Sequence, residues 1–515
     1  MATERYDVVI IGSGAGGGTL AWRLAATGKR ILLLERGAWL PREKENWNSQ
    51  AVFRQQRYRA AEIWHDGDGR PFHPGIHYWV GGNTKMYGSV LLRFRESDFE
   101  SIEHRGGISP AWPIRYEDLA PYYLQAERLY QAHGNRGEDP TEPPETESYP
   151  FAGLMHEPRI QELSEKLQAV GRRPFHLPVG LRLNEAHRRG SPCIRCETCD
   201  GFPCLVNGKA DAQVICVEPA LAHPNVELRT GCHVERLETD ASGNEIKEVV
   251  YRHDGALYSV RGDLVVLSAG AINSAALLLR SANPAHPDGL ANRSGVVGRY
   301  YMCHNNGAFI AISKQRNPTR FQKTLGLNDY YFGDEDWNYP MGHIQMLGKL
   351  DSEMLREAAP RIVPGAALDA MAHYSFDFWL TGEDLPSWDN RVLVDRDDGI
   401  RIHYMENNVE GFRRLQAKLQ SLLNAIGCCD SGLIPCSAYL GKKIPIAGTA
   451  HQCGTVRFGT SPRSSALDVH CRAHDIDNLY VVDSSFFVSS AAVNPALTII
   501  ANALRVGDHL ATRLR

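Results

Sequence analysis

Short apolar runs, glycine turns and helical patterns alternate at the start of the chain. Residues 6–11 form a continuous apolar run, which is typical of a strand buried in a parallel sheet. A helical pattern follows through Ala21, Leu24 and Ala25, and residues 30–34 form a second apolar run. The order strand, helix, strand predicts one unit of an α/β fold with a Rossmann-like sheet.

Similar patterns return in the middle and near the end of the chain. Residues 224–238 predict two short strands at an edge of this sheet, and residues 262–282 predict a strand, a glycine turn and a helix. Residues 478–487 predict another strand, and a helix is expected to begin near Pro495, a residue favoured in the first helical turn. The Rossmann-like domain is therefore expected to combine distant parts of the chain.

Other stretches have a less regular pattern. Residues 77–99 contain a glycine pair, then polar residues, then a short strand pattern. Residues 134–150 are rich in Pro, Glu and Gly, which predicts an exposed loop. Residues 310–445 contain many aromatic side chains, and we interpret them as part of a second domain covering the first. A chain of 515 residues is too long for one compact core, which agrees with two domains.

The turn after the first predicted strand carries a G-x-G-x-x-G fingerprint. Gly12 permits the tight turn, Gly14 lets a pyrophosphate approach the backbone, and Gly17 allows close helix–strand contact. The pyrophosphate would lie against the helix N-terminus, where free N–H groups favour negative charge. Glu35 is placed to accept hydrogen bonds from an adenosine ribose. Both NAD and FAD use this arrangement, so the fingerprint predicts a dinucleotide without choosing between them.

Composition excludes several classes of partner. A net charge of −4 offers no basic surface for nucleic acid or anionic membrane. No apolar stretch of about 18 residues predicts a membrane span, and the N-terminus lacks the pattern of a secretion signal. Without such a signal, the twelve cysteines favour reduced thiols and a cytoplasmic location over a disulfide framework.

Several segments together resemble the glucose–methanol–choline (GMC) family of FAD-dependent oxidoreductases. The similarity covers the fingerprint, "VGGNTKMYG", "VVLSAGAINSAALLL", "HQCGTVRFG" and "AAVNPALTIIANALRVGD", in this order along the chain. It implies a GMC-type two-domain architecture. The discontinuous FAD-binding domain would comprise residues 1–103, 205–308 and 447–515, and a mixed α+β substrate-binding domain and cap would comprise 104–204 and 309–446.

The resemblance also implies a set of cofactor-binding positions. Val234 would lie near the adenine, the 81–83 turn would lie beside the isoalloxazine, and Asp483 and Ala496 would lie near the pyrophosphate and ring. Some sugar-oxidising relatives bond the flavin covalently through a histidine; the aligned position here is Met86, so FAD is expected to bind non-covalently. The complete set of expected FAD contacts is Gly12, Gly14, Gly17, Glu35, Gly81, Gly82, Asn83, Val234, Asp483 and Ala496.

The family pattern places two catalytic side chains against the flavin, and here they correspond to His451 and Asn494. Alcohol oxidation removes a hydroxyl proton and a hydride from one carbon; FAD takes the hydride. A neutral imidazole suits the proton acceptor, so we assign His451 as the general base. The Asn494 amide can donate a hydrogen bond to the alcohol oxygen. Alone, an isolated histidine is usually structural or surface-exposed, and an asparagine before proline often marks a turn. His304 matches a recurrent family position and is interpreted as supporting the fold.

The sequence leaves the substrate open among related classes. A secondary alcohol of a sugar or glycoside is preferred, with an aliphatic, aromatic or sterol alcohol as the alternative. The electron acceptor would be oxygen or another molecule. A non-catalytic FAD-binding electron-transfer subunit and an NAD-dependent dehydrogenase are the alternatives from other classes.

A cysteine cluster raises the question of a metal. Four cysteines follow the spacing C-x₂-C-x₂-C-x₄-C, close to but different from the ferredoxin pattern. Thiolates are ligands for zinc and iron–sulfur clusters, yet the spacing fits neither type well, so a metal-free loop is predicted. The residues are Cys193, Cys196, Cys199 and Cys204.

Overall fold

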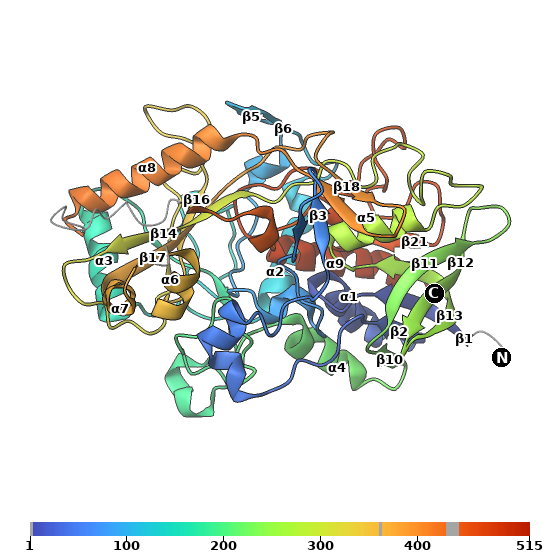
Figure 1. Cartoon of the computed structure of the whole chain (residues 1–515), viewed down its shortest axis with the longest axis horizontal. Helices are drawn as coiled ribbons and strands as arrows, with labels where there is room; N and C mark the ends of the chain where they lie inside the picture. Colours follow the sequence, from blue (N-terminus) through green and yellow to red (C-terminus); the bar gives the residue numbers. More distant parts are fainter. Residues whose placement is uncertain (1–3, 360–362, 429–441) are drawn as a thin grey trace.

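The computed structural model describes residues 4–359, 363–428 and 442–515. A seven-stranded sheet lies at one end of the molecule, close to both chain termini (Figure 1). Its strand order is β10-β2-β1-β13-β12-β11, and β21 also pairs with β13. In chain order these strands are β1 (Glu4–Ile11), β2 (Ile31–Leu34), β10 (Val226–Arg229), β11 (His233–Thr239), β12 (Ile246–His253), β13 (Ala256–Leu267) and β21 (Leu479–Val481).

The central strands are apolar because they are buried on both faces. Strand β1 pairs in parallel with β2 and with β13, and Val8, Val9 and Ile10 are fully buried. Three long helices belong to this part: α1 (Ala15–Ala25), α5 (Ala271–Arg280) and α9 (Ala496–Arg513). The α/β class is thus confirmed, and strands and helices form in the predicted segments from the beginning, middle and end of the chain. The strand predicted over 478–487 is limited to Leu479–Val481, and the two strands predicted together at one edge lie at opposite edges, as β10 and β11.

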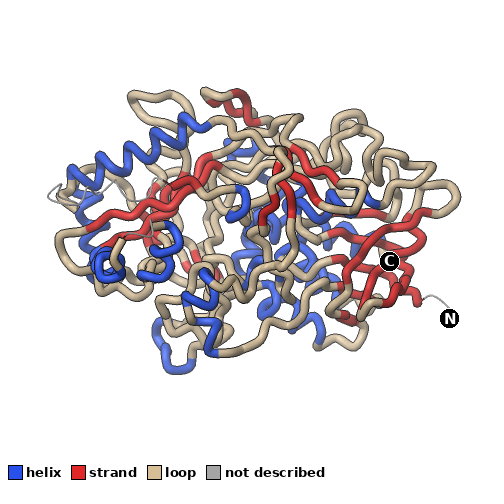
Figure 2. The backbone as a smooth tube through the Cα atoms, viewed as in Figure 1, coloured by secondary structure: helices blue, strands red, loops and turns tan. Residues whose placement is uncertain are grey.

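A second sheet forms the other end of the molecule (Figure 2). Its strand order is β20-β14-β17-β16-β15-β8, and its described pairs are antiparallel. Helix α8 (Val409–Ala425) covers one face, where its leucines pack against alternate residues of the central strands. The strands are β8 (Phe175–His176), β14 (Asn305–Ile312), β15 (Leu325–Leu327), β16 (His343–Met346), β17 (Ser375–Gly382) and β20 (Lys442–Lys443).

A smaller four-stranded sheet connects segments from the two predicted domains. It joins β3 (Trp64–Asp66) and β4 (Pro71–Phe72) to β18 (Arg391–Val394) and β19 (Ile400–His403). The predicted range 309–446 lies partly outside the described residues, and the domain boundaries stay a prediction. The remaining elements are β5 (Ile102–His104), β6 (Gly107–Ser109), α2 (Tyr116–Leu129), β7 (Ala132–His133), α3 (Pro158–Ala169), β9 (Val179–Gly180), α4 (Glu218–Leu221), α6 (Ser352–Ala358) and α7 (Gly365–Tyr374).

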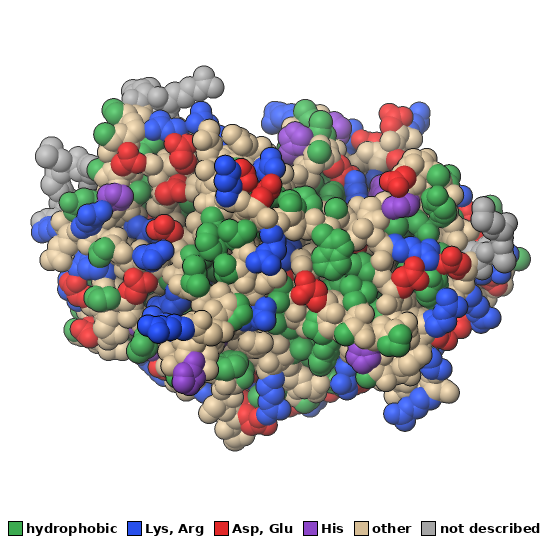
Figure 3. Space-filling view, turned by 90° about the horizontal axis from the view of Figure 1, so that it is seen from below, with side chains coloured by type: hydrophobic (Ala, Val, Ile, Leu, Met, Phe, Trp, Pro, Cys, Tyr) green, Lys and Arg blue, Asp and Glu red, His purple; other side chains and the backbone are tan. Residues whose placement is uncertain are grey.

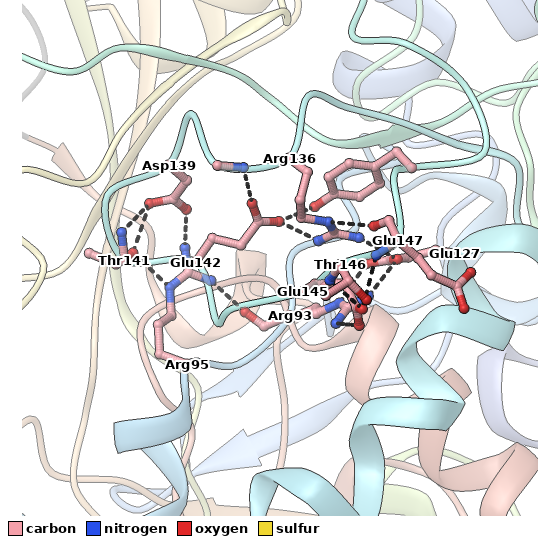
Figure 4. A network of polar contacts seen from close by, with 12 residues as sticks. Arg93, Arg95, Glu127, Arg136, Asp139, Thr141, Glu142, Glu145, Thr146 and Glu147 are labelled. Atoms are coloured by element: carbon pink, nitrogen blue, oxygen red, sulfur yellow. Dashed lines mark hydrogen bonds and ion pairs between the residues drawn. The ribbon is translucent and has the colours of Figure 1, made fainter.

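One local prediction was wrong, and a second was confirmed only in part. The stretch after the glycine pair forms no strand; it contains a single bridge, from Val90 to Val179. The acidic segment 134–150 is largely a loop, as predicted, but it is not simply solvent-exposed. Glu145 and Asp139 pair with the buried Arg93 and Arg95 outside the segment (Figure 4), because buried guanidinium groups require counter-charges.

The surface carries both signs of charge. On the face shown in Figure 3, Lys and Arg side chains are interspersed with Asp and Glu. Among the described residues, no helix combines the length and apolar character needed to cross a bilayer.

Candidate active site

The fingerprint glycines are required by close backbone contacts. Gly12 has a φ of +97°, and a Cβ at this position would lie 2.3 Å from the Ser268 carbonyl oxygen. A Cβ on Gly17 would lie 2.0 Å from the Gly12 carbonyl oxygen. Gly14 differs, because the nearest protein atom to its ideal Cβ is the Gly82 Cα at 4.0 Å. The polypeptide therefore demands glycine at positions 12 and 17 and leaves space beside position 14.

Ser13 joins three of the predicted cofactor segments. Its backbone N–H and hydroxyl donate to the Glu35 carboxylate at 3.0 and 2.6 Å. The Ser13 Oγ also accepts a hydrogen bond from the Gly81 N–H at 3.0 Å. Helix α1 begins just after Gly14 with no side-chain cap and no acidic residue in its first turn. Its N-terminus is thus suited to an anion such as a pyrophosphate.

The glycine pair forms a turn held by neighbouring backbone. Gly81 and Gly82 have φ values of +95° and +56°, in the left-handed region that favours glycine. The Asn83 Oδ1 accepts a hydrogen bond from the His77 N–H at 2.9 Å, which fixes the turn. Met86 follows this turn and is buried.

The remaining predicted cofactor residues lie on three other segments of the chain. The Cys232 N–H donates to the Glu35 carbonyl at 2.9 Å, so the strand carrying Val234 begins beside Glu35. Asp483 accepts hydrogen bonds from the Gly270 N–H at the start of α5 and from Ser274 Oγ. Ala496 is the first residue of α9. The structure brings these segments together, while their contacts with FAD stay a prediction.

His451 lies directly opposite His304. Met302 and Cys453 exchange two backbone hydrogen bonds of 3.0 Å in an antiparallel bridge, and this register places residues 304 and 451 across from one another. The two Nδ1 atoms are 3.1 Å apart, and the rings are perpendicular with centroids separated by 5.2 Å. The opening residue of the H-Q-x-G-T motif is therefore paired with another imidazole.

The second nitrogen of His304 decides how the pair is protonated. His304 Nε2 lies 3.0 Å from the Ser490 carbonyl oxygen, which can only accept. In the neutral tautomer His304 Nδ1 is then an acceptor, so His451 Nδ1–H must donate to it. His451 Nε2 is left without a hydrogen. Burial lowers the pKa of His451 to about 3, and the nearby Lys323 cation acts in the same direction. His451 is thus neutral at physiological pH.

Asn494 is half-buried and lies just before α9. Several hydrogen bonds hold the preceding segment, and two of them matter for this site. His304 Nε2–H donates to the Ser490 carbonyl at 3.0 Å, and Thr381 Oγ1 on β17 donates to the Ala492 carbonyl at 2.5 Å. His304 therefore connects His451 to the segment that carries Asn494.

The cysteine cluster shows no metal site within the described residues. No group of three or more His, Cys, Asp or Glu side chains there has the arrangement of a metal site. Cys204 Sγ accepts a hydrogen bond from the Gly208 N–H at 3.2 Å, and burial raises the pKa of Cys193 to about 11, which favours the thiol over the thiolate. The metal-free loop stays a prediction.

Two residues of this site were not assigned these roles from the sequence. Ser13 occupies a variable position of the fingerprint, and its contacts with Glu35 and Gly81 depend on segments far apart in the chain. His304 was interpreted as a fold-supporting residue; its pairing with His451 comes from the Met302–Cys453 bridge, for which the sequence carries no periodic signal.

Comparison with known proteins identifies the family of the chain. Family models described as GMC oxidoreductase match residues 6–305 and 400–503. The chain is 30% identical to 6'''-hydroxyparomomycin C oxidase of Streptomyces lividus, over 100% of this chain and 92% of the relative. It is also 30% identical to paromamine 6'-oxidase of Streptomyces fradiae, over 97% and 90%. A third relative, 2-methyl-1,2-propanediol dehydrogenase of Mycolicibacterium austroafricanum, is 27% identical over 99% and 96%.

Solved structures share the fold at lower identity. Pyridoxine 4-oxidase from Mesorbium loti has a TM-score of 0.67 at 18% identity, covering 98% of each chain. A formate oxidase variant from Aspergillus oryzae RIB40 has a TM-score of 0.68 at 14% identity, covering 100% of this chain and 99% of the other. The predicted resemblance is confirmed. The chain belongs to the GMC oxidoreductase family and is an oxidoreductase that acts on alcohols.

Proposed function

We propose that the protein oxidises a secondary alcohol group of a sugar or glycoside, using non-covalently bound FAD. The observation that carries the proposal is the His304–His451 pair, which leaves His451 Nε2 unprotonated at a predicted catalytic position. The two relatives named for paromamine and hydroxyparomomycin favour a sugar-like substrate. The relative named for 2-methyl-1,2-propanediol favours the alternative, an aliphatic alcohol.

The residues present fit the cofactor. An uncapped helix N-terminus, an open space beside Gly14 and the buried Glu35 carboxylate are what a flavin dinucleotide needs. Glu35 already accepts three hydrogen bonds, from Ser13 N–H and Oγ–H and from Gly37 N–H, and a carboxylate offers about four acceptor sites. One site remains for a ribose hydroxyl. Methionine at position 86 offers no imidazole for a covalent bond, which supports non-covalent binding.

His451 and Asn494 would have different roles at the alcohol group. His451 Nε2 accepts the hydroxyl proton, while Nδ1–H stays bonded to His304 and holds the ring orientation. The Asn494 amide donates to the alcohol oxygen as negative charge develops there. When bound, FAD supplies the acceptor for the hydride from the same carbon. The products are a carbonyl compound and a two-electron-reduced cofactor, to be reoxidised by oxygen or another acceptor.

An anaerobic bleaching screen tests this proposal. Purified protein is mixed with sugars, glycosides, sterols and simple alcohols, and flavin absorbance is followed. Sugars or glycosides are expected to bleach the flavin fastest, and acid denaturation is expected to release FAD into the supernatant. If only simple alcohols bleach the flavin, the substrate class is an aliphatic alcohol and not a sugar or glycoside. Flavin that stays with the precipitated chain would refute non-covalent binding, and no bleaching by any alcohol would refute the activity.

A further inference from the structure

The face of the second sheet opposite α8 carries an unusual row of side chains. In the antiparallel register, Ala308 on β14 and Gln345 on β16 both lie directly across from Trp379 on β17. Directly opposed residues point to the same face. The alternate residues Phe376, Phe378 and Leu380 point to the other face, into the cluster under α8. Trp379 is therefore directed away from that core.

Trp379 is partly exposed although it lies in a central strand. It belongs to none of the hydrophobic clusters that the described residues form. Among the described residues, no hydrogen-bond partner lies at the Trp379 indole N–H. Buried or half-buried indoles usually satisfy this donor, so the side chain has the character of a contact surface and not of a core residue.

On this face of the sheet, other parts of the protein cover the residues on either side of Trp379 along the strands. At the outer end, Ile310 packs with Leu368 and Met371 of α7. At the inner end, Thr381 lies two residues from Trp379, about 7 Å along the strand, and binds the Ala492 carbonyl. The open indole thus lies between the α7 cover and the segment that carries Asn494.

Gln345 presents a defined group beside this indole. Its Oε1 atom is 3.1 Å from His343 Nε2, and His343 Nδ1 is 2.7 Å from Asn328 Oδ1. Burial lowers the pKa of His343 to about 3, so only one of its nitrogens carries a hydrogen. Two amide oxygens cannot both be bonded by that single hydrogen. One of the two amides must be rotated.

The charge network of Figure 4 decides which amide rotates. Asn328 Nδ2 donates to Asp139 Oδ2 at 2.8 Å, and Asp139 is paired with the Arg95 guanidinium at 2.5 Å. Rotating Asn328 would place its oxygen against a carboxylate, so Asn328 Oδ1 stays the acceptor and His343 carries its hydrogen on Nδ1. The Gln345 amide nitrogen must then donate to His343 Nε2. Its oxygen is then left without a hydrogen-bond donor among the described residues, although the residue is only 2% exposed.

We propose that Trp379 and Gln345 form a ring-binding subsite for the substrate, an inference that rests on the proposed sugar or glycoside oxidation. The indole stacks against the C–H face of a sugar ring. Gln345 Oε1 accepts a hydrogen bond from a hydroxyl or ammonium group of that ring. This subsite holds the substrate beside Asn494 without taking part in the chemistry.

The test compares Trp379→Leu with the matched control Trp388→Leu. Trp388 is 44% exposed and stacks with the Arg299 side chain, so it represents a surface tryptophan. Probes are paromamine and methyl glucoside, with propan-2-ol as a ring-free alcohol. Affinity is measured by calorimetry on FAD-loaded proteins carrying His451→Ala, so that binding is observed without turnover. Flavin reduction is measured on the same tryptophan variants with His451 intact.

Trp379→Leu is expected to weaken binding of the better sugar probe by about tenfold or more, the effect of losing one aromatic contact face. Gln345→Leu should weaken the same probe. FAD content and reduction by propan-2-ol should match those of Trp388→Leu. If the wild type is reduced by a sugar and Trp379→Leu binds it with unchanged affinity, the subsite is wrong and the proposed function stands. If only propan-2-ol reduces the wild type and neither sugar binds, both the sugar assignment and the subsite are wrong.

Discussion

At the scale of single residues, the proton acceptor role of His451 depends on which ring nitrogen carries the hydrogen. Two consecutive hydrogen bonds, from His304 to the Ser490 carbonyl and from His451 to His304, place that hydrogen on Nδ1 of His451. Low pKa alone would make His451 neutral, but it would not orient the ring. His304 is therefore a positioning residue. Its φ of +63° shows that the backbone is held in the left-handed region at this position.

Replacing His451 tests the base assignment. His451→Ala is expected to slow flavin reduction by roughly 10²–10⁴-fold, the usual effect of losing a general base. FAD content should stay at the wild-type value, because the fingerprint is unchanged. Stopped-flow absorbance measures the rate. His223→Ala, at an exposed histidine, is the control. Wild-type reduction rates in His451→Ala would remove His451 from the mechanism.

Replacing His304 tests positioning through the pH profile. In the wild type, protonation of His451 should not reduce the rate between pH 7 and 5, since burial lowers its pKa to about 3. In His304→Ala the site gains water, which relieves the burial that disfavours the charged imidazole, so the pKa of His451 should rise towards its usual value near 6.5. Protonated His451 cannot accept a proton, and the rate should then fall as the pH falls through that pKa.

The variant His304→Asn supplies the matched comparison. Asparagine tolerates the left-handed backbone and offers an Oδ1 acceptor near the position of Nδ1. It should restore part of the reduction rate that His304→Ala loses. Equal rates and equal pH profiles for the two variants would contradict the positioning role.

At the scale of elements, the turn leading into helix α1 contains both kinds of glycine. Two glycines are needed by the fold, and one is available to a ligand. Gly12 and Gly17 are enclosed by backbone at 2.3 and 2.0 Å from their ideal Cβ positions, whereas Gly14 has 4.0 Å of clearance. The acidic loop 134–150 likewise has a structural task. Glu127 on α2 and Glu145 of this loop both pair with the buried Arg93 (Figure 4).

Gly14→Ala is expected to leave the polypeptide fold intact and to reduce FAD affinity at least tenfold, because only the approaching pyrophosphate needs this space. Circular dichroism of the apoprotein and FAD titration measure the two effects separately. Gly190→Ala, with no atom within 4 Å of its Cβ, should change neither. Full FAD affinity in Gly14→Ala would show that the fingerprint does not contact the cofactor as predicted.

Glu127→Gln should destabilise the protein strongly. Glu127 accepts two hydrogen bonds from Arg93 at 2.7 and 2.8 Å and one from Arg136 at 2.8 Å. Both Arg93 and Glu127 have side chains only 1% exposed, and breaking a buried pair typically costs about 3–5 kcal/mol. The measurement is the shift in thermal midpoint. Glu147→Gln removes a pair exposed at 59% and 49% and should cost under about 1 kcal/mol.

At the scale of the whole molecule, the proposed cofactor site is made from both ends and the middle of the chain. Contacts join residues 12–17 to residues 81–82, 268 and 482. A ligand that binds only the assembled arrangement stabilises the entire fold by mass action, by about 2.7 kcal/mol at 100 times its dissociation constant. FAD added to the apoprotein should therefore raise the thermal midpoint progressively with concentration, as scanning fluorimetry would show. NAD should not raise it. An equal rise with NAD would reverse the cofactor assignment.

Local patterns determined much of the nucleotide-binding half. The apolar runs at 6–11 and 30–34, the glycine fingerprint and the helix near Pro495 were predictable because strand burial, tight turns and helix starts depend on neighbouring residues. The family motifs added His451 and Asn494. The same local signals misrepresented the acidic loop 134–150, since composition predicts solvation and contains no information about buried arginines elsewhere.

The pairing of His304 with His451 and the row of Gln345 beside Trp379 were decided only by the tertiary structure. The first depends on a single bridge between residues 302 and 453, and the second on the register of strands β16 and β17. Which nitrogen of each imidazole carries the hydrogen depends in turn on distant acceptors, the Ser490 carbonyl and the Asp139 carboxylate. Local sequence specifies backbone conformation through short-range sterics, but strand register and proton placement are set by contacts between segments far apart in the chain.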